Sequence, residues 1–424
     1  MAIKFQKSYP VLFYFFPTLT IIALLYVYIP QYQTKIAYLI FNETQQFQMD
    51  YFLNGFIRQN AVLPRAQERK SNWSIGMPNF KIILMWGLRS GLIGNEPLIK
   101  AECPITSCEF TPDESMINKS DVVVFYVETL TDFPTNRHPH QRFVFFQLES
   151  PMNSNILKIS DHRLRYGYFN WTMTYRWDSD IVHRGDYGFI VKKLSNNIRR
   201  PYGMRSIQIN RWFSKTFWRE NQFQLPSSVE NNQIENTIKG KTKMIAWIVS
   251  HCSTPIRREE YVRKLRQYVS IDIFGSCTNN KCVPNCDNML RSDYKFYLSF
   301  ENSWCPDYVT EKFYRPMMFD TVPIVMGGAN YSKFAPPNSY INARDFNSPK
   351  ELADYILLLN STDTMYAKYF EWKTDYEIIL SDNSGLCDLC RMAHDKTLPS
   401  KTYNDIQHWW INELKCENNS RKYF

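Results

Sequence analysis

Short apolar runs alternate with amphipathic segments through the second half of the chain. The apolar runs have the length of buried strands and are bounded by turn residues: residues 243–251, 271–275, 295–302 and 322–327. Apolar side chains recur at helical spacing in the segments that separate or follow these runs: residues 255–269, 310–320 and 351–359. Strands that alternate with helices build parallel sheets, so the pattern predicts an α/β fold with ligands beyond the carboxyl ends of the strands.

The first half of the chain is less regular but contains the same kind of strand. Its apolar runs are separated by loops rich in Pro, Asn and His: residues 81–87, 121–130 and 141–149. A length of 424 residues favours two domains. We predict a first domain over residues 76–240, which ends in a basic, Asn-rich bridge, a second domain over residues 241–395 and a C-terminal tail over residues 396–424.

The N-terminal residues have the pattern of a membrane anchor. Residues 11–29 contain no charged side chain and are long enough to cross a bilayer. Lys4 and Lys7 precede this run, which favours a cytoplasmic tail over residues 1–10, a transmembrane signal anchor over residues 11–30 and a lumenal remainder. A cleaved signal peptide is the alternative, but no small-residue cleavage site follows the run. The polar residues 31–75 are interpreted as a stem.

Cysteines and glycosylation sequons agree with a lumenal location. The chain has ten Cys residues and seven Asn-x-Ser/Thr sequons, and an even number of Cys in an oxidising compartment favours disulfides. A zinc site made by Cys103, Cys108, Cys387 and Cys390 is the alternative use of these thiols. The net charge of +9 is spread along the chain without a long Lys/Arg block, so we expect small acidic ligands and no nucleic acid.

The segment from Phe296 to Gly328 carries the strongest chemical signal. A strand, a polar loop and a helix that begins near Thr310 follow one another here. The Lys312 ammonium and the start of the helix suit a diphosphate, Tyr308 suits a nucleotide, and Glu311 suits ribose hydroxyls. Without further information, Glu311 and Lys312 are equally well explained as surface residues of a first helical turn.

Three motifs resemble those of the α1,3-fucosyltransferases. They are Phe300-Glu301-Asn302-Ser303 followed by Asp307-Tyr308-Val309-Thr310-Glu311-Lys312-Phe313, then Val322-Pro323-Ile324-Val325, and upstream the stretch from Phe169 to Asp180. The resemblance covers roughly residues 80 to 395 and is looser in the first half. It implies a Golgi type II membrane enzyme with two Rossmann-like domains facing a cleft, the GT-B-like architecture.

The resemblance also implies the reaction and the residues that perform it. The family transfers L-fucose from GDP-fucose, with inversion, to the 3-hydroxyl of a GlcNAc residue, which is either a core or an antennal residue of a glycan. Glu149 matches the catalytic carboxylate. The donor-site residues by motif are Tyr187, Ser250, Arg257, Tyr297, Asn302, Tyr308, Glu311 and Lys312. His251 stands where many members have Asn, which puts that donor contact in doubt.

The same resemblance suggests a set of disulfides. In a two-domain enzyme of this type the chain end returns to the first domain, so Cys103 and Cys108 are expected to pair with Cys387 and Cys390. A further bridge is expected between Cys252 and Cys305, because both follow strands of the donor half.

Two other functions are consistent with parts of the sequence. Asp178-Ser179-Asp180 is a D-x-D pair of the kind that holds a divalent metal in many nucleotide-sugar transferases. Under the resemblance no cofactor or metal is required, because Arg257 and Lys312 neutralise the diphosphate, and a divalent cation would at most stimulate. The other alternative is a non-catalytic lumenal carbohydrate-binding protein, which would not need Glu149, Arg257 and Lys312 together.

Overall fold

A computed structural model describes most of the chain beyond residue 79. The described residues are 80–87, 92–154, 159–185, 187–192, 240–283, 285–380 and 383–417. The predicted anchor (11–30), stem (31–75) and nearly all of the bridge (192–240) lie outside them. No helix within the described ranges is both long and apolar enough to cross a bilayer. All described residues belong to one unit, Gly76–Phe424.

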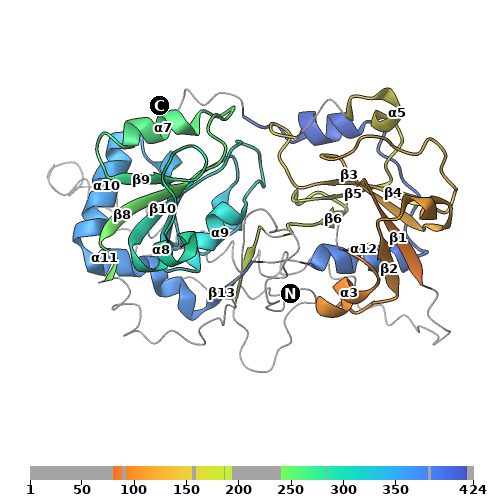
Figure 1. The fold of residues 1–424 in the computed structure, drawn as a ribbon, viewed down its shortest axis with the longest axis horizontal. Coiled ribbons are helices and arrows are strands. Elements are labelled where there is room, and N and C mark those ends of the chain that lie inside the picture. The colour runs from red at the N-terminus through yellow and green to blue at the C-terminus, as the bar shows by residue number, and fades with distance from the viewer. Residues whose placement is uncertain are drawn as a thin grey trace, which may run out of the picture. The chain divides into compact units, whose positions relative to one another are not determined.

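The first sheet has six parallel strands in the order β2-β1-β3-β4-β5-β6 (Figure 1). Its strands are β1 (Lys81–Trp86), β2 (Cys108–Thr111), β3 (Val122–Tyr126), β4 (Arg142–Gln147), β5 (Trp171–Thr174) and β6 (Ile181–Val182). The helical elements along this part of the chain are α3 (Glu96–Lys100), η1 (Glu114–Lys119) and α5 (His162–Arg165). The predicted strands at 81–87, 121–130 and 141–149 are confirmed as β1, β3 and β4.

Both faces of this sheet are covered, which explains why its strands are apolar at almost every position. On one face, Ile83 and Val124 pack against Leu98 of α3 and against Leu386 and Leu389 of α12 (Ser384–His394). The other face is covered by α5 and by the π-helical turn η5 (His408–Glu413). Two elements from the end of the chain thus complete the core of the first sheet, and Figure 1 shows α12 beside β1 and β2.

The second sheet has five parallel strands in the order β12-β11-β10-β8-β9. The strands are β8 (Lys243–Ile248), β9 (Ile271–Phe274), β10 (Tyr294–Phe300), β11 (Val322–Met326) and β12 (Ile341–Asn342). The helical elements are α7 (Arg258–Leu265), α8 (Cys286–Ser292), α9 (Glu311–Met317), η2 (Tyr331–Lys333), η3 (Ala343–Asp345), α10 (Pro349–Ser361), α11 (Asp363–Ala367) and η4 (Lys368–Thr374). The predicted parallel α/β organisation and all seven strands and helices predicted for this half are confirmed.

Alternate side chains of the central strand β10 pack into two different hydrophobic cores, one on each face of the sheet. Phe296 and Leu298 pack towards α7, α10 and α11. Tyr297 packs on the opposite face, with Met289 and Leu290 of α8. Because every residue of β10 is buried, its carboxyl end brings the following loop into the interior of the protein. A short antiparallel pair, β7 (Phe189–Lys192) with β13 (Tyr376–Ile379), was not predicted.

Five disulfides join the ten cysteines. Cys103 pairs with Cys387 and Cys108 pairs with Cys390, which confirms the predicted link between the first sheet and the chain end. The zinc alternative for these four residues is wrong, because a disulfide sulfur offers no thiolate to a metal. The bridge predicted between Cys252 and Cys305 is also wrong. Cys252 pairs with Cys277, Cys305 with Cys416 and Cys282 with Cys286.

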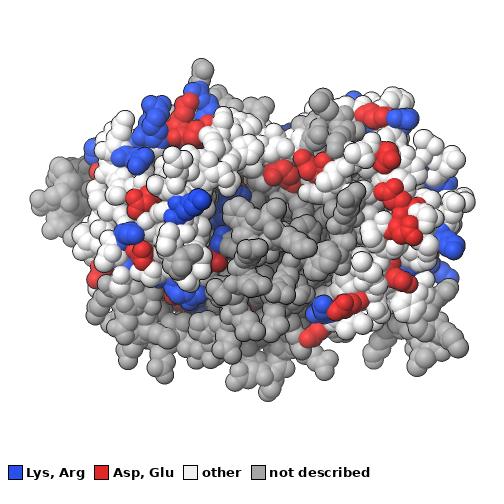
Figure 2. Space-filling model, viewed as in Figure 1, with Lys and Arg blue, Asp and Glu red and all other residues white. Residues whose placement is uncertain are grey.

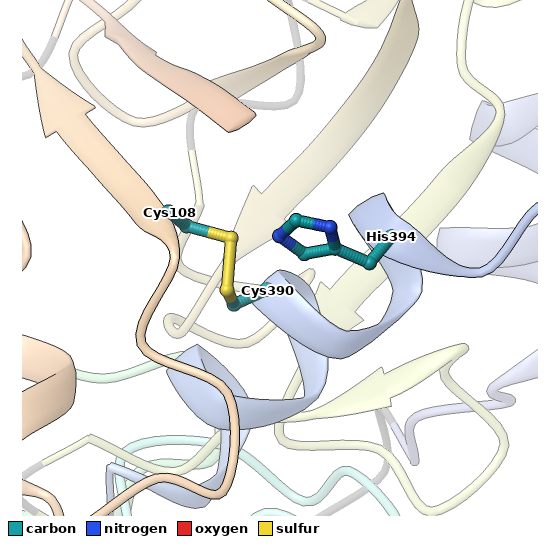
Figure 3. A group of neighbouring side chains, drawn as sticks. All are labelled: Cys108, Cys390 and His394. Atoms are coloured by element: carbon teal, nitrogen blue, oxygen red, sulfur yellow. A yellow bond between two sulfur atoms is a disulfide. The ribbon is translucent and has the colours of Figure 1, made fainter. Parts of the chain in front are cut away.

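His394 lies beside one of these disulfides (Figure 3). Its imidazole projects from the end of α12 towards the Cys108–Cys390 bridge, and its Nε2 lies 3.0 Å from the Ser107 hydroxyl. The contact ties the end of α12 to the start of β2.

Over the face drawn in Figure 2, Lys and Arg side chains of the described residues lie among Asp and Glu side chains. Lys350 and Asp354, one turn apart on α10, form an ion pair at the surface.

Candidate active site

Glu149 lies just beyond the carboxyl end of β4, where the chain turns. The buried side chain of Gln147 shapes this turn, because its Oε1 accepts hydrogen bonds from the amides of Leu148 at 2.9 Å and Glu149 at 3.1 Å. The next residue, Ser150, is buried, and its hydroxyl lies 2.5 Å from the hydroxyl of Ser303. The end of β4 is therefore joined directly to the loop that follows β10.

One carboxylate oxygen of Glu149 receives all of its hydrogen bonds. Oε1 accepts from the Tyr308 hydroxyl at 2.6 Å, the Ser150 amide at 3.0 Å and the Asn302 side-chain amide at 3.4 Å. Within the part of the chain that the structure describes, no group donates to Oε2. The carboxylate is thus held through Oε1 by three donors from the loops after β4 and β10.

Two tyrosines whose rings meet edge-on support this arrangement. Tyr308 is 1% exposed, and burial together with Tyr187 and Glu149 raises its pKa well above the ordinary value. Tyr308 consequently remains a hydrogen-bond donor to Glu149. The ring of Tyr187 meets that of Tyr308 edge-on at 6.2 Å, and the Tyr187 hydroxyl donates to the Leu148 carbonyl at 2.7 Å.

Lys312 lies on the first turn of α9, among oxygen atoms. Its Nζ is 2.9 Å from the Thr310 hydroxyl, 3.2 Å from a Glu311 oxygen and 3.5 Å from a Glu301 oxygen. Burial alone would lower the pKa of Lys312, but the carboxylates of Glu311 and Glu301 outweigh it and raise the pKa. Burial alone would likewise raise the pKa of Glu311, and Lys312 reverses this and lowers it. Lys312 is therefore a stable cation, with 26% of its side chain exposed.

The other predicted donor residues are not joined to Glu149 by direct contacts between described residues. Tyr297 is buried in β10, and its hydroxyl donates to the Ile248 carbonyl at 3.3 Å. Ser250 is exposed just after β8. Arg257 is the N-cap of α7 with φ of +54°, is largely exposed, and pairs with Glu260 on the same helix.

Two buried charged residues near this site received no role from the sequence. Arg258 is 3% exposed, and its guanidinium donates to the carbonyls of Phe300 and His251. Helical periodicity could have indicated this, because Arg258 shares the buried face of α7 with Tyr261, Val262 and Leu265. The second is Glu301, which is 0% exposed. A charged residue that ends an otherwise apolar strand was the available signal.

The D-x-D pair is engaged with cations of this chain. Asp178 accepts from the Arg176 guanidinium at 2.7 Å and 2.5 Å. Asp180 lies 2.5 Å from the Lys401 ammonium and accepts from the Tyr403 hydroxyl at 2.9 Å. The contacts of Asp180 attach the C-terminal segment to the first sheet, whereas Asp178 pairs with a residue of its own loop.

Comparisons with known proteins agree with the motifs at this site. A family model described as "Fucosyltransferase, N-terminal" matches residues 78–188, and one described as "Glycosyltransferase family 10 (fucosyltransferase) C-term" matches residues 238–409. The Drosophila melanogaster protein "Alpha-(1,3)-fucosyltransferase C" is 35% identical over 351 residues, which are 79% of this chain and 77% of that protein. The Caenorhabditis elegans protein "Alpha-(1,3)-fucosyltransferase fut-1" is 35% identical over 304 residues, which are 69% of this chain and 61% of that protein.

A solved structure described as "Crystal Structure of alpha1,3-Fucosyltransferase with GDP-fucose" is 17% identical, with a TM-score of 0.44, and the match covers 78% of this chain and 95% of that one. The two family models and the two relatives carry the assignment, because together they span both parallel sheets and the loops that hold Glu149, Tyr308 and Lys312. The chain belongs to glycosyltransferase family 10, the fucosyltransferases.

Proposed function

We propose that this chain is an α1,3-fucosyltransferase that moves L-fucose from GDP-fucose, with inversion, to the 3-hydroxyl of a GlcNAc residue on an N-glycan or a related glycan. Relatives named as α1,3-fucosyltransferases at 35% identity support the reaction class. The observation that carries the proposal is the bonding of Glu149, whose Oε1 is held by Tyr308 and Asn302 while Oε2 is left to react.

Glu149 acts as the general base in this reaction. The acceptor 3-hydroxyl oxygen attacks the anomeric carbon of fucose on the face opposite GDP, and its proton passes to Oε2 of Glu149. The bond between the anomeric carbon and the GDP oxygen breaks, and its electron pair leaves with GDP. Because Tyr308 and Asn302 fix the other oxygen, the carboxylate is oriented before the acceptor arrives.

Lys312 and Arg257 stabilise the GDP that leaves. Negative charge grows on the diphosphate as the bond breaks, and a fixed cation stabilises the transition state more than the ground state. The Lys312 ammonium occupies a prearranged position beside Thr310. Arg257 is exposed and paired with Glu260, and because exposed pairs are weak its guanidinium can exchange this partner for a phosphate oxygen.

For the architecture, we infer two Rossmann-like domains that face a cleft, as in the GT-B-like enzymes, with the donor in the second domain. The two separate parallel sheets support this arrangement.

For the location, we infer a single-pass type II protein of the Golgi membrane, anchored by residues 11–30 with the catalytic part in the lumen. Five disulfides among the described residues support an oxidising compartment.

The test is a transfer assay with the purified full-length chain. GDP-fucose is offered with acceptors that end in GlcNAc or in Gal-GlcNAc, GDP release is measured, and the product linkage is determined by NMR. We expect fucose on the 3-hydroxyl of GlcNAc in the α configuration. A folded chain that binds the glycans but releases no GDP would instead support a carbohydrate-binding protein.

The same assay with EDTA separates metal-dependent from metal-independent transfer. We expect activity to persist, because Asp178 and Asp180 already hold Arg176 and Lys401. Complete loss of transfer with EDTA, restored by a divalent cation, would favour a metal-dependent transferase.

A further inference from the structure

Glu301 is a fully buried carboxylate at the carboxyl end of β10. None of its surface is exposed, although a charged group in the interior is costly unless it is paired and hydrogen-bonded. Its Oε1 accepts from the Thr310 amide at 2.8 Å, and the Thr310 hydroxyl lies 3.0 Å and 2.9 Å from the two carboxylate oxygens. Glu301 therefore accepts hydrogen bonds from both the amide and the hydroxyl of Thr310, the N-cap residue of α9.

The same carboxylate reaches the cation of the proposed donor site. Lys312 Nζ lies 3.5 Å from Glu301 Oε2 and 2.9 Å from the Thr310 hydroxyl. Thr310 thus bridges the two charges, with the carboxylate buried and the ammonium partly exposed. An anion behind a cation in this way fixes the direction in which the cation presents its remaining N–H groups.

The glycine after β11 provides the space for Glu301. A Cβ atom on Gly327 would lie 3.3 Å from Cγ of Glu301 and 2.6 Å from the Tyr331 hydroxyl. Any side chain at this position would displace Glu301 or Tyr331. The Glu301 side chain thus lies in a closely packed, fully buried position, where it is not exposed to a substrate.

We propose that Glu301 is a positioning residue, which holds the Lys312 ammonium in its charged form and directs it at the diphosphate of the donor. Glu301 does not touch the donor itself and acts only through Lys312 and Thr310. The proposal rests on the proposed function, because it assigns a task to Glu301 only if a diphosphate binds at Lys312.

The charges around Lys312 make this role measurable. Glu301 from β10, Glu311 from α9 and Glu149 from β4 favour the ammonium, whereas burial and Arg258 from α7 disfavour it. Without the negative charge of Glu301, the effects of burial and Arg258 on Lys312 are offset less, so the pKa of Lys312 falls.

Glu301→Gln tests the proposal, since glutamine keeps the shape and an oxygen that accepts from the Thr310 amide. kcat and KM for GDP-fucose are measured from pH 6 to pH 11. For the wild type we expect KM to keep its value over most of this range. For Glu301→Gln we expect KM to be raised at every pH, because the ammonium is no longer directed at the diphosphate, and kcat/KM to begin to fall at a lower pH than in the wild type.

Two further variants separate positioning from stability. Glu301→Asp retains the charge and should restore most of the alkaline range even if KM stays raised. Asp320→Asn is the matched control, because it removes the ion pair between Asp320 and Lys373 beyond the other end of α9. Asp320 has φ of +52°, which asparagine tolerates. The control should lower the melting temperature without changing the pH profile.

The proposal is overturned if Glu301→Gln has the pH profile of the wild type, or if Asp320→Asn changes it equally. Should Glu301→Gln not fold, Thr310→Val removes the bridging hydroxyl and leaves both charges in place. A KM for GDP-fucose equal to that of the wild type in this variant would also overturn it. A wild type that neither binds GDP nor transfers fucose would refute the proposed function itself, which is a different outcome.

Discussion

At the scale of single residues, the site depends on the unequal use of the two oxygens of Glu149. Oε1 collects three donors, from Tyr308, Ser150 and Asn302. A second residue whose state matters is His183, which follows β6. Its ring is 7% exposed, and its Nδ1 is buried without a hydrogen-bond partner in the described part of the chain. Glu149 is the proposed general base, and His183 is expected to affect stability.

Replacing Glu149 with Gln should abolish most transfer while GDP still binds. The amide oxygen of Gln can take the place of Oε1. Its NH2 group cannot take the proton from the sugar 3-hydroxyl, and loss of a general base typically lowers the rate by about 10²–10⁴-fold. The measurements are kcat with saturating substrates and the Kd for GDP. Glu109→Gln on the exposed side of β2 is the control. Near-normal transfer by Glu149→Gln would mean that another group takes the proton.

His183 should make the protein sensitive to acid. Burial lowers the pKa of His183 to about 4, so the unfolded chain binds this proton at a higher pH than the folded protein does. Its contribution is fully present above about pH 6.5 and is lost as the pH falls towards 4, by about 2–3 kcal/mol at pH 4.5.

The check is urea unfolding at pH 7 and pH 4.5. His183→Phe keeps a flat ring that cannot be protonated, so the drop in stability between the two pH values should be smaller in this variant. His162→Phe at an exposed position is the control and should behave as the wild type does. Equal drops in the wild type and His183→Phe would contradict the assignment.

At the scale of elements, the loops after neighbouring parallel strands form one unit in the second sheet. The loops after β8 and β9 are joined by the Cys252–Cys277 disulfide and by the hydrogen bond from the Val249 amide to the Phe274 carbonyl at 2.8 Å. Gly275 has φ of +102°, and a Cβ atom there would lie 2.5 Å from the Val249 carbonyl oxygen. This close approach of two backbones places Ser250, a predicted donor residue, on a rigid support.

Gly275→Ala should therefore loosen the donor side of the site. Both the positive φ and the clash disfavour alanine, and we expect a loss of about 1–3 kcal/mol in the free energy of unfolding. Gly94→Ala is the matched control, because Gly94 has φ of +66° but nothing lies within 4 Å of a Cβ atom there. If both variants lose equal stability and keep the KM for GDP-fucose, the contact with Val249 is unimportant.

At the scale of the whole molecule, the end of the chain is bound into the first sheet. The Cys103–Cys387 and Cys108–Cys390 bridges span 284 and 282 residues and hold α12 against that sheet. Beyond α12, Arg165 pairs with Asp405 at 2.6 Å, and Trp410 is fully buried. The chain thus passes from the first sheet to the second and returns, so the first sheet depends on segments that are distant in sequence.

Removing both long bridges should cost far more stability than removing a short one. With Cys103, Cys108, Cys387 and Cys390 all changed to Ala, the chain-entropy model gives a loss of about 5 kcal/mol for the first bridge. The second bridge adds about 2–3 kcal/mol, because it closes only a short loop once the first is formed. The control is Cys282→Ala with Cys286→Ala, a bridge over 4 residues, for which the same model gives about 2 kcal/mol. Equal unfolding midpoints in urea for the two variants would exclude this entropic role.

The sequence alone determined most of the elements of the second sheet and supplied the candidates for the reactive groups. Periodicity is a local property, so the strands β8 to β11 and the helices α7, α9 and α10 follow from residues that are close in the chain. Glu149, Tyr308 and Lys312 were found because motifs preserve the order of residues around an active site. Their roles stay predictions, but the contact between Glu149 and Tyr308 brings two of the three together.

The tertiary structure decided which distant residues meet. The bonds between Ser150 and Ser303, and between Glu149 and Asn302, each join residues 153 positions apart. The partners of Cys252 and Cys305 likewise depend on the path of the chain, and spacing in the sequence contains no information about that path. Burial decided the rest: the packing of both faces of the second sheet leaves Arg257 exposed and places Glu301 and Arg258 in the interior, although periodicity in α7 was a signal for Arg258.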